Sequence, residues 1–111
     1  MKQVINGKLF DTAKAQQIHN WSNGNDTGNF HYEEETLYKS KGGIFFLWVE
    51  GGAASAWKTY YPADRRSGWG EQLIVLGGDN GETNEQAALK WCEERECEAD
   101  VIAKYFQVQE A

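Results

Sequence analysis

Two histidines and a run of glutamates are the residues best suited to metal binding or acid–base chemistry. His31 precedes Glu33, Glu34 and Glu35, and His31 and Glu33 fall on one face of an extended strand, a spacing compatible with chelation. His19 is the only other histidine. A metal site needs a third and a fourth ligand, and the sequence identifies neither. We therefore predict a solvated strand end, no metal and no cofactor, and we keep an unrecognised hydrolase around His31 as an alternative function.

Nucleophilic chemistry has no support in the sequence. Cys92 and Cys97 are five residues apart in a stretch with helical periodicity, which places them about 140° apart around a helix. That separation predicts reduced thiols and no intrahelical disulfide or shared metal. The chain has no motif of a serine or cysteine nucleophile, a zinc protease or a phosphate-binding loop. We therefore predict no catalytic residues and a protein that is not an enzyme.

The stretch 33–57 organises the elements that would position a site. Ile44–Val49 is a run of six apolar residues between two pairs of glycines, which predicts a central strand covered on both faces. Residues 32–39 alternate in character and predict a partner strand across the turn 40–43. One face of that strand carries Glu34, Thr36 and Tyr38, and the other carries Glu33, Glu35 and Leu37.

The flanking segments predict one α+β domain over residues 1–111. Asn6-Gly7 predicts a hairpin, and a cap at Asp11 or Thr12 predicts a helix over about 13–21. Residues 57–61 and 71–76 read as strands around a polar loop, and Thr83-x-x-Gln86 opens a helix through about 95, followed by another over 99–106. We predict a single, mostly antiparallel sheet of five or six strands, with one early helix and two C-terminal helices covering one face.

Charge points to a protein partner. The net charge is −6, and residues 79–111 carry nine acidic and three basic side chains. Such a surface repels phosphate backbones and attracts basic protein grooves. We therefore predict no direct nucleic-acid binding through this face and a host protein with a basic surface as the partner. The predicted partner-binding acids are Glu93, Glu94, Glu96, Glu98 and Asp100.

A second candidate surface is the aromatic and arginine-rich loop after the central strand. Its residues are Trp57, Tyr60, Arg65, Arg66 and Trp69, and these types dominate the energetics of protein interfaces. Two other interpretations remain open. The aromatics can pack the sheet while the arginines are solvated, or the set can stack on a small ligand, which would make the chain a ligand-binding regulatory domain.

Several segments together resemble a family of small uncharacterised bacterial proteins that open with an "ING-K-x-(Y/F)-D-T" pattern. They are Ile5–Thr12 with Ala15, Glu35–Lys39 with Gly43, Phe46 and Leu47, then Glu50–Gly52, Gly68–Glu71, and Ala88–Trp91 with Glu94. The resemblance spans nearly the whole chain and departs from the pattern at 53–61 and in the more acidic C-terminal region. It implies a compact α+β fold and a habitat, since such proteins are often carried on phages and conjugative elements.

The function we expect is a non-enzymatic, acidic protein-binding module of a bacterial mobile element. The habitat implied by the resemblance suggests an inhibitor of a host nucleic-acid-targeting defence system, of the anti-CRISPR or anti-restriction type. The sequence shows no secretory leader and no apolar run near 18 residues, which favours a cytoplasmic protein without a membrane partner. The oligomeric state is left open.

Overall fold

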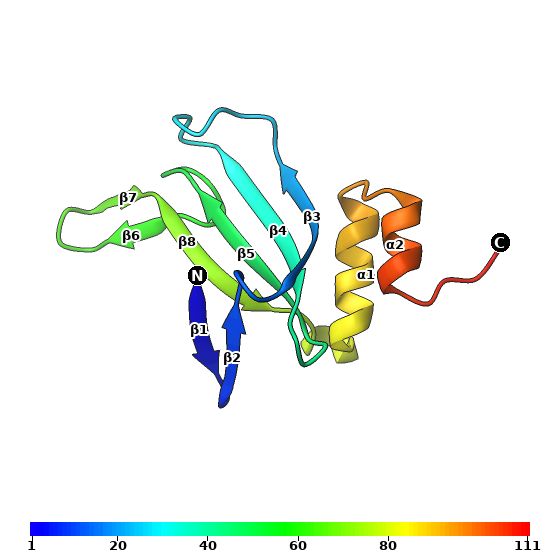
Figure 1. The fold of residues 1–111 in the computed structure, drawn as a ribbon. Helices are drawn as coiled ribbons and strands as arrows, with labels where there is room; N and C mark the ends of the chain where they lie inside the picture. Colours follow the sequence, from blue (N-terminus) through cyan, green and yellow to red (C-terminus); the bar gives the residue numbers. More distant parts are fainter.

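The centre of the molecule is a four-stranded antiparallel sheet. A computed structural model describes residues 1–111 and orders the strands β3-β4-β5-β8 (Figure 1). These strands are β3 (Gln16–Ser22), β4 (Glu33–Lys39), β5 (Phe45–Gly51) and β8 (Gly70–Val75). The predicted β4–β5 hairpin and the alternation of faces along β4 are confirmed. β5 is the central strand because it pairs with β4 on one side and β8 on the other.

Two separate two-stranded sheets flank this centre, so the predicted single sheet of five or six strands is wrong. β1 (Lys2–Ile5) pairs with β2 (Lys8–Asp11), and β6 (Thr59–Tyr61) pairs with β7 (Arg66–Gly68). The β1–β2 turn is the predicted one, with Asn6 at φ 52° and Gly7 at φ 76°. The chain is elongated, 51 × 34 × 30 Å, and the β6–β7 hairpin projects from it on the side away from the helices (Figure 1).

The predicted early helix over 13–21 is wrong, because this segment forms a turn and then strand β3. Asp11 closes the turn, since its Oδ1 accepts a hydrogen bond from the N–H of Ala13 at 3.0 Å and its carbonyl accepts from Lys14 and Ala15. β3 then pairs with β4 along its length, with a bulge between Gln17 and His19. The long-range pairing with β4 outweighs the weak local helical preference.

The two helices lie side by side against one face of the sheet, on the side away from the β6–β7 hairpin (Figure 1). A 3-10 turn, η1 (Asp79–Gly81), precedes α1 (Asn84–Glu94), and α2 (Ala99–Tyr105) follows. Thr83 and Gln86 form the predicted capping box, which is confirmed. Asn84 fastens the start of α1 to the sheet, because its side chain exchanges hydrogen bonds of 2.8 Å with the backbone of Phe45. Neither helix has the length and apolar composition needed to cross a membrane.

Each face of the sheet is covered by a different element. The helix-covered face holds the larger core, in which Leu37, Leu47 and Val49 pack against Ala88 and Trp91. On the opposite face the β1–β2 hairpin places Phe10 against Phe46 and Leu73. Trp48 lies on this second face and is only half-buried. Glu34, Glu50 and Glu71 lie on this same face, opposite one another on β4, β5 and β8.

A buried ion pair joins the sheet to the end of α1. The Oε1 atom of Glu35 on β4 accepts hydrogen bonds from Arg95 Nε at 2.8 Å and from Trp91 Nε1 at 2.7 Å. The Glu35 side chain is 3% exposed and the Arg95 side chain 23%. The Arg95 guanidinium also lies 5.1 Å from the ring centre of Trp21 on β3. This cluster of Glu35, Arg95, Trp91 and Trp21 therefore ties β3, β4 and α1 together.

Removing one partner of this pair should destabilise the protein strongly. Arg95→Met leaves the buried Glu35 carboxylate without its cation, which typically costs about 3 to 5 kcal/mol. We expect the melting temperature to fall by on the order of 10 °C or more. The measurement is the free energy of unfolding from urea titration followed by circular dichroism.

The matched control is Lys90→Met, which removes a lysine of the same helix. Lys90 pairs with Glu82 at 3.5 Å on the exposed surface, so its loss should cost under about 1 kcal/mol. Glu35→Gln combined with Arg95→Met should recover part of the loss, because no charge is then buried alone. An Arg95→Met protein as stable as the control would contradict this role of the pair.

Candidate functional site

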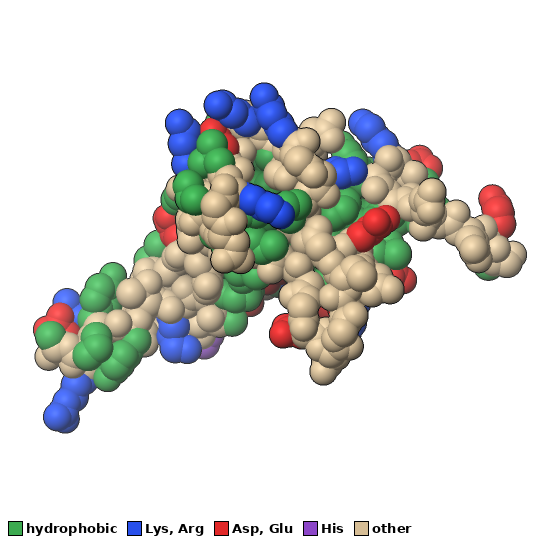
Figure 2. Space-filling view, turned by 90° about the horizontal axis from the view of Figure 1, so that it is seen from below, with side chains coloured by type: hydrophobic (Ala, Val, Ile, Leu, Met, Phe, Trp, Pro, Cys, Tyr) green, Lys and Arg blue, Asp and Glu red, His purple; other side chains and the backbone are tan.

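The hairpin formed by residues 59–68, here called the arm, is the most exposed structured part of the chain. Every residue of β6 is exposed, and the tyrosines Tyr60 and Tyr61 are 57% and 47% exposed. Figure 2 shows apolar side chains along this projection. Monomeric proteins rarely expose large contiguous apolar surface unless it binds something. The arm is therefore a candidate docking surface.

The structure gathers four of the five predicted aromatic and arginine residues on or beside the arm. Arg65 lies at its tip with φ 51°, and Arg66 pairs with Asp64 at 3.5 Å. Tyr60 and Trp69 are exposed. Trp57 differs, because it is half-buried and packs against the helix-side core, and its indole N–H is buried without a hydrogen-bond partner. Trp57 therefore packs on the core with part of its side chain and leaves only the remainder at the surface.

The base of the arm is held by aromatic stacking and by close backbone contacts. The Trp69 ring stacks on Tyr32 with centroids 5.6 Å apart, and its Nε1–H donates to Glu71 at 3.2 Å. Gly70 is required here because a Cβ at this position would overlap the Trp57 carbonyl. These contacts fix the point at which the arm leaves the sheet while its outer part remains free.

A shallow hollow of about 310 Å³ opens beside this base. Its apolar lining includes Phe30, Ala53 and Trp69, with Phe30 70% exposed and Trp69 39% exposed. Backbone bonds fix the wall of the hollow, since the Phe30 carbonyl accepts from the N–H of Ala54 at 2.7 Å. The hollow is large enough to receive one apolar side chain of a partner or a small ligand.

The predicted acidic residues form a separate surface, here called the acidic cap. All five members are exposed and surround the turn between α1 and α2: Glu93, Glu94, Glu96, Glu98 and Asp100. Arg95 lies in the same run, but its guanidinium points inward to Glu35 and also contacts Glu94 at 3.3 Å. The cap therefore keeps a strong negative charge. The arm and the cap lie on opposite flanks of the sheet, so the structure does not bring the two predicted sets together (Figure 1).

The expected separation of the two cysteines around one helix is wrong. α1 ends at Glu94, and Glu96 has φ 56°, which reverses the chain so that the N–H of Cys97 donates to the Cys92 carbonyl at 3.0 Å. Both thiols are free and buried. Burial raises the pKa of Cys92 to about 12, with further contributions from Cys97 and Glu93, and burial also raises the pKa of Cys97. Both therefore stay protonated and weakly nucleophilic at neutral pH.

A row of three carboxylates crosses the second sheet face, and no local sequence pattern predicts it. The register pairs Glu34 with Glu50 and Glu50 with Glu71, so like charges lie directly opposite one another on β4, β5 and β8. Burial, a hydrogen bond with Glu34 and the charges of Glu34 and Glu71 raise the pKa of Glu50 to about 7. Burial and the charges of Glu34 and Glu50 also raise the pKa of Tyr32 and of Tyr38.

The histidines and neighbouring glutamates are not assembled into one site. His31 is exposed in the loop before β4, and Glu33 accepts a hydrogen bond from the N–H of Ala56 at 2.8 Å. Glu35 is on the helix-covered face, where His19 packs edge-on against Trp91 at 5.8 Å. No three His, Cys, Asp or Glu side chains are grouped so that they could hold a metal ion.

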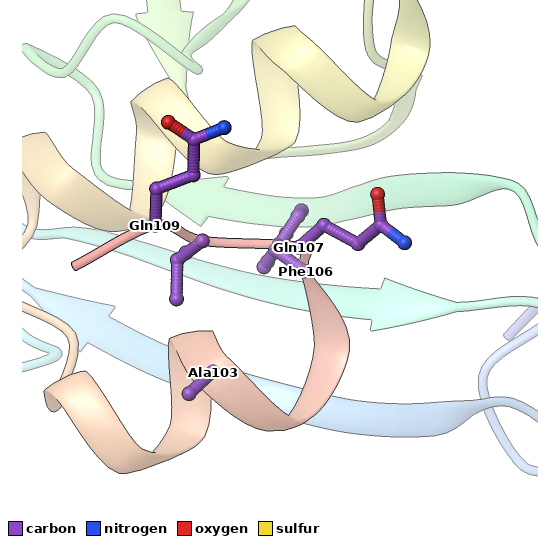
Figure 3. A pocket seen from close by; sticks show the side chains of 5 residues that line it. Ala103, Phe106, Gln107 and Gln109 are labelled. Carbon is purple, nitrogen blue, oxygen red and sulfur yellow. The ribbon is translucent and has the colours of Figure 1, made fainter.

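Another hollow, of about 750 Å³, lies between α2 and the C-terminal tail. Figure 3 shows that Ala103 of α2 faces the tail. The rest of the lining comes from Phe106, Gln107, Val108 and Gln109. These side chains are apolar or amides, so the hollow offers no titratable or nucleophilic group.

No family model matches the chain, and no curated protein or solved structure matches it either.

The carboxylate row should make stability depend on pH near neutrality. Glu50 has an ordinary pKa of 4.5 in the unfolded chain and about 7 when folded, so the folded state binds more protons between these values. The contribution of Glu50 to the free energy of unfolding should therefore be greatest below about pH 4.5, and it should be lost as the pH rises to about 7. Solvent screening limits the effect to on the order of 1 kcal/mol.

Glu50→Gln tests this directly. The amide keeps the shape and removes the charge, so the variant should be more stable than the original protein at pH 8 and equally stable at pH 4. Urea titrations across the pH range give the comparison. A constant difference at all pH values would show that Glu50 does not titrate in this way.

Proposed function

We propose that this chain is a non-enzymatic protein-binding module whose partner docks on the arm and the adjoining hollow. The observation that carries the proposal is the exposure of Tyr60, Tyr61, Phe30 and Trp69 around one projecting hairpin. Tyrosine, tryptophan and arginine are the residues most often responsible for interface affinity. The hollow beside Trp69 gives an apolar anchor of the partner a place to insert.

The absence of any element packed on the arm supports its use in recognition. An isolated two-stranded hairpin is marginal in water, and the arm has no helix or second sheet packed on it. Its exposed tyrosines are therefore not needed to build the core of the chain. Burial of these rings against another protein would offset the cost of leaving them in water.

We further propose that the partner is a protein with a basic surface. The acidic cap favours a protein with a basic surface, because complementary charge speeds encounter and selects partners. Together with the resemblance to proteins of phages and conjugative elements, it supports an inhibitor of a host nucleic-acid-targeting defence system. In this form the arm provides most of the affinity, and the cap orients the approach.

A small-ligand-binding regulatory domain is the second candidate. The hollow of about 310 Å³ favours it, since this volume lies at the lower end of the range of small-molecule sites. Its open shape and its position beside the arm suit an inserted side chain better. Phe30→Ser would weaken either kind of binding, so the arm itself must be changed to separate the two candidates.

The test is affinity capture from a bacterial host with quantitative mass spectrometry. The arm variant is Tyr60→Ser with Arg65→Gly, in which glycine preserves the positive φ at the tip. We expect this variant to lose at least tenfold of the captured partner. The matched control is Val4→Ser with Leu9→Ser, an exposed apolar pair on the β1–β2 hairpin, which should capture the partner as the original protein does.

The cap is tested in the same assay by Glu93→Gln, Glu96→Gln and Glu98→Gln. This variant should bind the partner more slowly at low salt and nearly normally at high salt, where screening already removes long-range attraction. Undiminished capture by the arm variant, with loss on the cap variant alone, would overturn the arm as the docking surface.

A further inference from the structure

A second concave surface lies at the opposite end of the sheet from the acidic cap, and it is basic. Lys14 from the turn before β3, Lys39 at the end of β4 and Lys41 in the β4–β5 turn line a hollow of about 640 Å³. Gln16, Ser40, Gly42 and Gly43 complete the lining, which contains no carboxylate and no apolar side chain. Figure 2 views the molecule from this end and shows lysine and arginine side chains gathered along one rim.

The ammonium groups of this hollow, here called the lysine hollow, have no anionic partner within the chain. The ion pairs of the structure involve Arg66, Lys90 and Arg95 only. Lys39 lies over the Phe45 ring at 5.3 Å, and the other two lysines make no ion pair. In a protein with a net charge of −6, three lysines that line one hollow and make no ion pair form a local site of attraction for anions. One carboxylate lies nearby, since Asp11 lines a neighbouring hollow together with Lys14 and Lys41, and the local charge stays positive.

The backbone of the β4–β5 turn adds further donors. Ser40 and Ile44 close the turn, because the N–H of Ser40 donates to the Ile44 carbonyl at 2.8 Å and the N–H of Ile44 donates to Ser40 Oγ at 3.0 Å. The N–H groups of Lys41 and Gly42 donate to no acceptor within the chain. The Ser40 hydroxyl accepts from the N–H of Ile44 and donates to no acceptor within the chain, so its proton is also available. Unpaired N–H groups beside ammonium groups are typical of phosphate-binding surfaces.

We propose that the lysine hollow binds the phosphate backbone of a nucleic acid. Three ammonium groups in an open hollow exceed what a single carboxylate requires, and they match a polymer that presents successive phosphates. A lipid surface would call for apolar side chains at the contact, and the lining has none. The lining also offers no aromatic face on which a base could stack, so the site recognises backbone and not sequence.

This site is separate from the arm and from the acidic cap. The cap repels nucleic acid, so a bound strand would lie along the lysine end and away from α1 and α2. The chain would then contact a basic protein with one end and nucleic acid with the other. Nucleic-acid binding does not depend on the arm, because no arm residue lines the lysine hollow. The arm variant should therefore bind nucleic acid as the original protein does.

The experiment is a titration of the isotope-labelled full chain with an oligothymidine of about ten nucleotides at low salt, followed by amide NMR. The largest shifts should occur at the N–H groups of Lys41 and Gly42. Fluorescence anisotropy of the labelled oligonucleotide should give a slope of log K against log salt of about −2, as expected for three phosphate contacts to a single strand.

The test variant is Lys14→Gln, Lys39→Gln and Lys41→Gln. It should lose at least tenfold in affinity. The control Lys58→Gln, Lys90→Gln and Lys104→Gln changes the net charge equally at other exposed positions and should stay within about twofold of the original protein. Equal losses in both variants, shifts away from the β4–β5 turn, or no binding at low salt would each overturn the proposal. Full displacement by inorganic triphosphate at equal phosphate concentration would also overturn it, because a small oligophosphate would then be the ligand.

Discussion

The ion pair between Glu35 and Arg95 is the interaction on which the arrangement of the molecule depends. It joins residues 60 positions apart and places the end of α1 against β4 at a fixed point. Because a buried carboxylate is costly without a cation and donors, α1 has one favourable position on the sheet. Trp91 donates to the same carboxylate oxygen, and Trp21 covers the guanidinium, so the charge is shielded from water as well as neutralised. The negative charge of the acidic cap is a consequence of this ion pair, because Arg95, the one cation among residues 93–100, is turned inward to Glu35.

The sheet separates the surfaces that we assign to recognition. Its helix-covered face is filled by the main core, and its other face carries the β1–β2 hairpin and the carboxylate row. The arm leaves one flank of the sheet, the acidic cap lies on the other, and the lysine hollow lies at the far strand ends (Figure 1). A negative and a positive end on one small chain allow it to approach a basic protein and a nucleic acid from different sides. The aromatic arm contributes the apolar area that charge alone cannot provide.

Local signals predicted the elements whose residues interact within a few positions. Asn6-Gly7, the Ile44–Val49 run and the Thr83–Gln86 capping box are such cases, and each is confirmed. β3 was missed because its stability comes from pairing with a strand more than ten residues later. The partner of Glu35 could not be predicted, since nothing near it in the sequence identifies Arg95. The exposure of the acidic cap was predictable from composition. Three other features depend on sheet register, which local sequence does not determine. They are the separation of the acidic cap from the arm, the carboxylate row, and the lysine hollow.

We propose that the arm serves recognition and not folding. Thr59 and Gly68 are paired opposite each other, so residues 60–67 can be replaced by Asn-Gly, the dipeptide suited to a two-residue hairpin turn. Thermal unfolding and partner capture are then measured on the same variant. We expect a melting temperature within a few degrees of that of the original protein, together with loss of the captured partner. A shortened chain that unfolds, or one that remains folded and captures the partner undiminished, would contradict it.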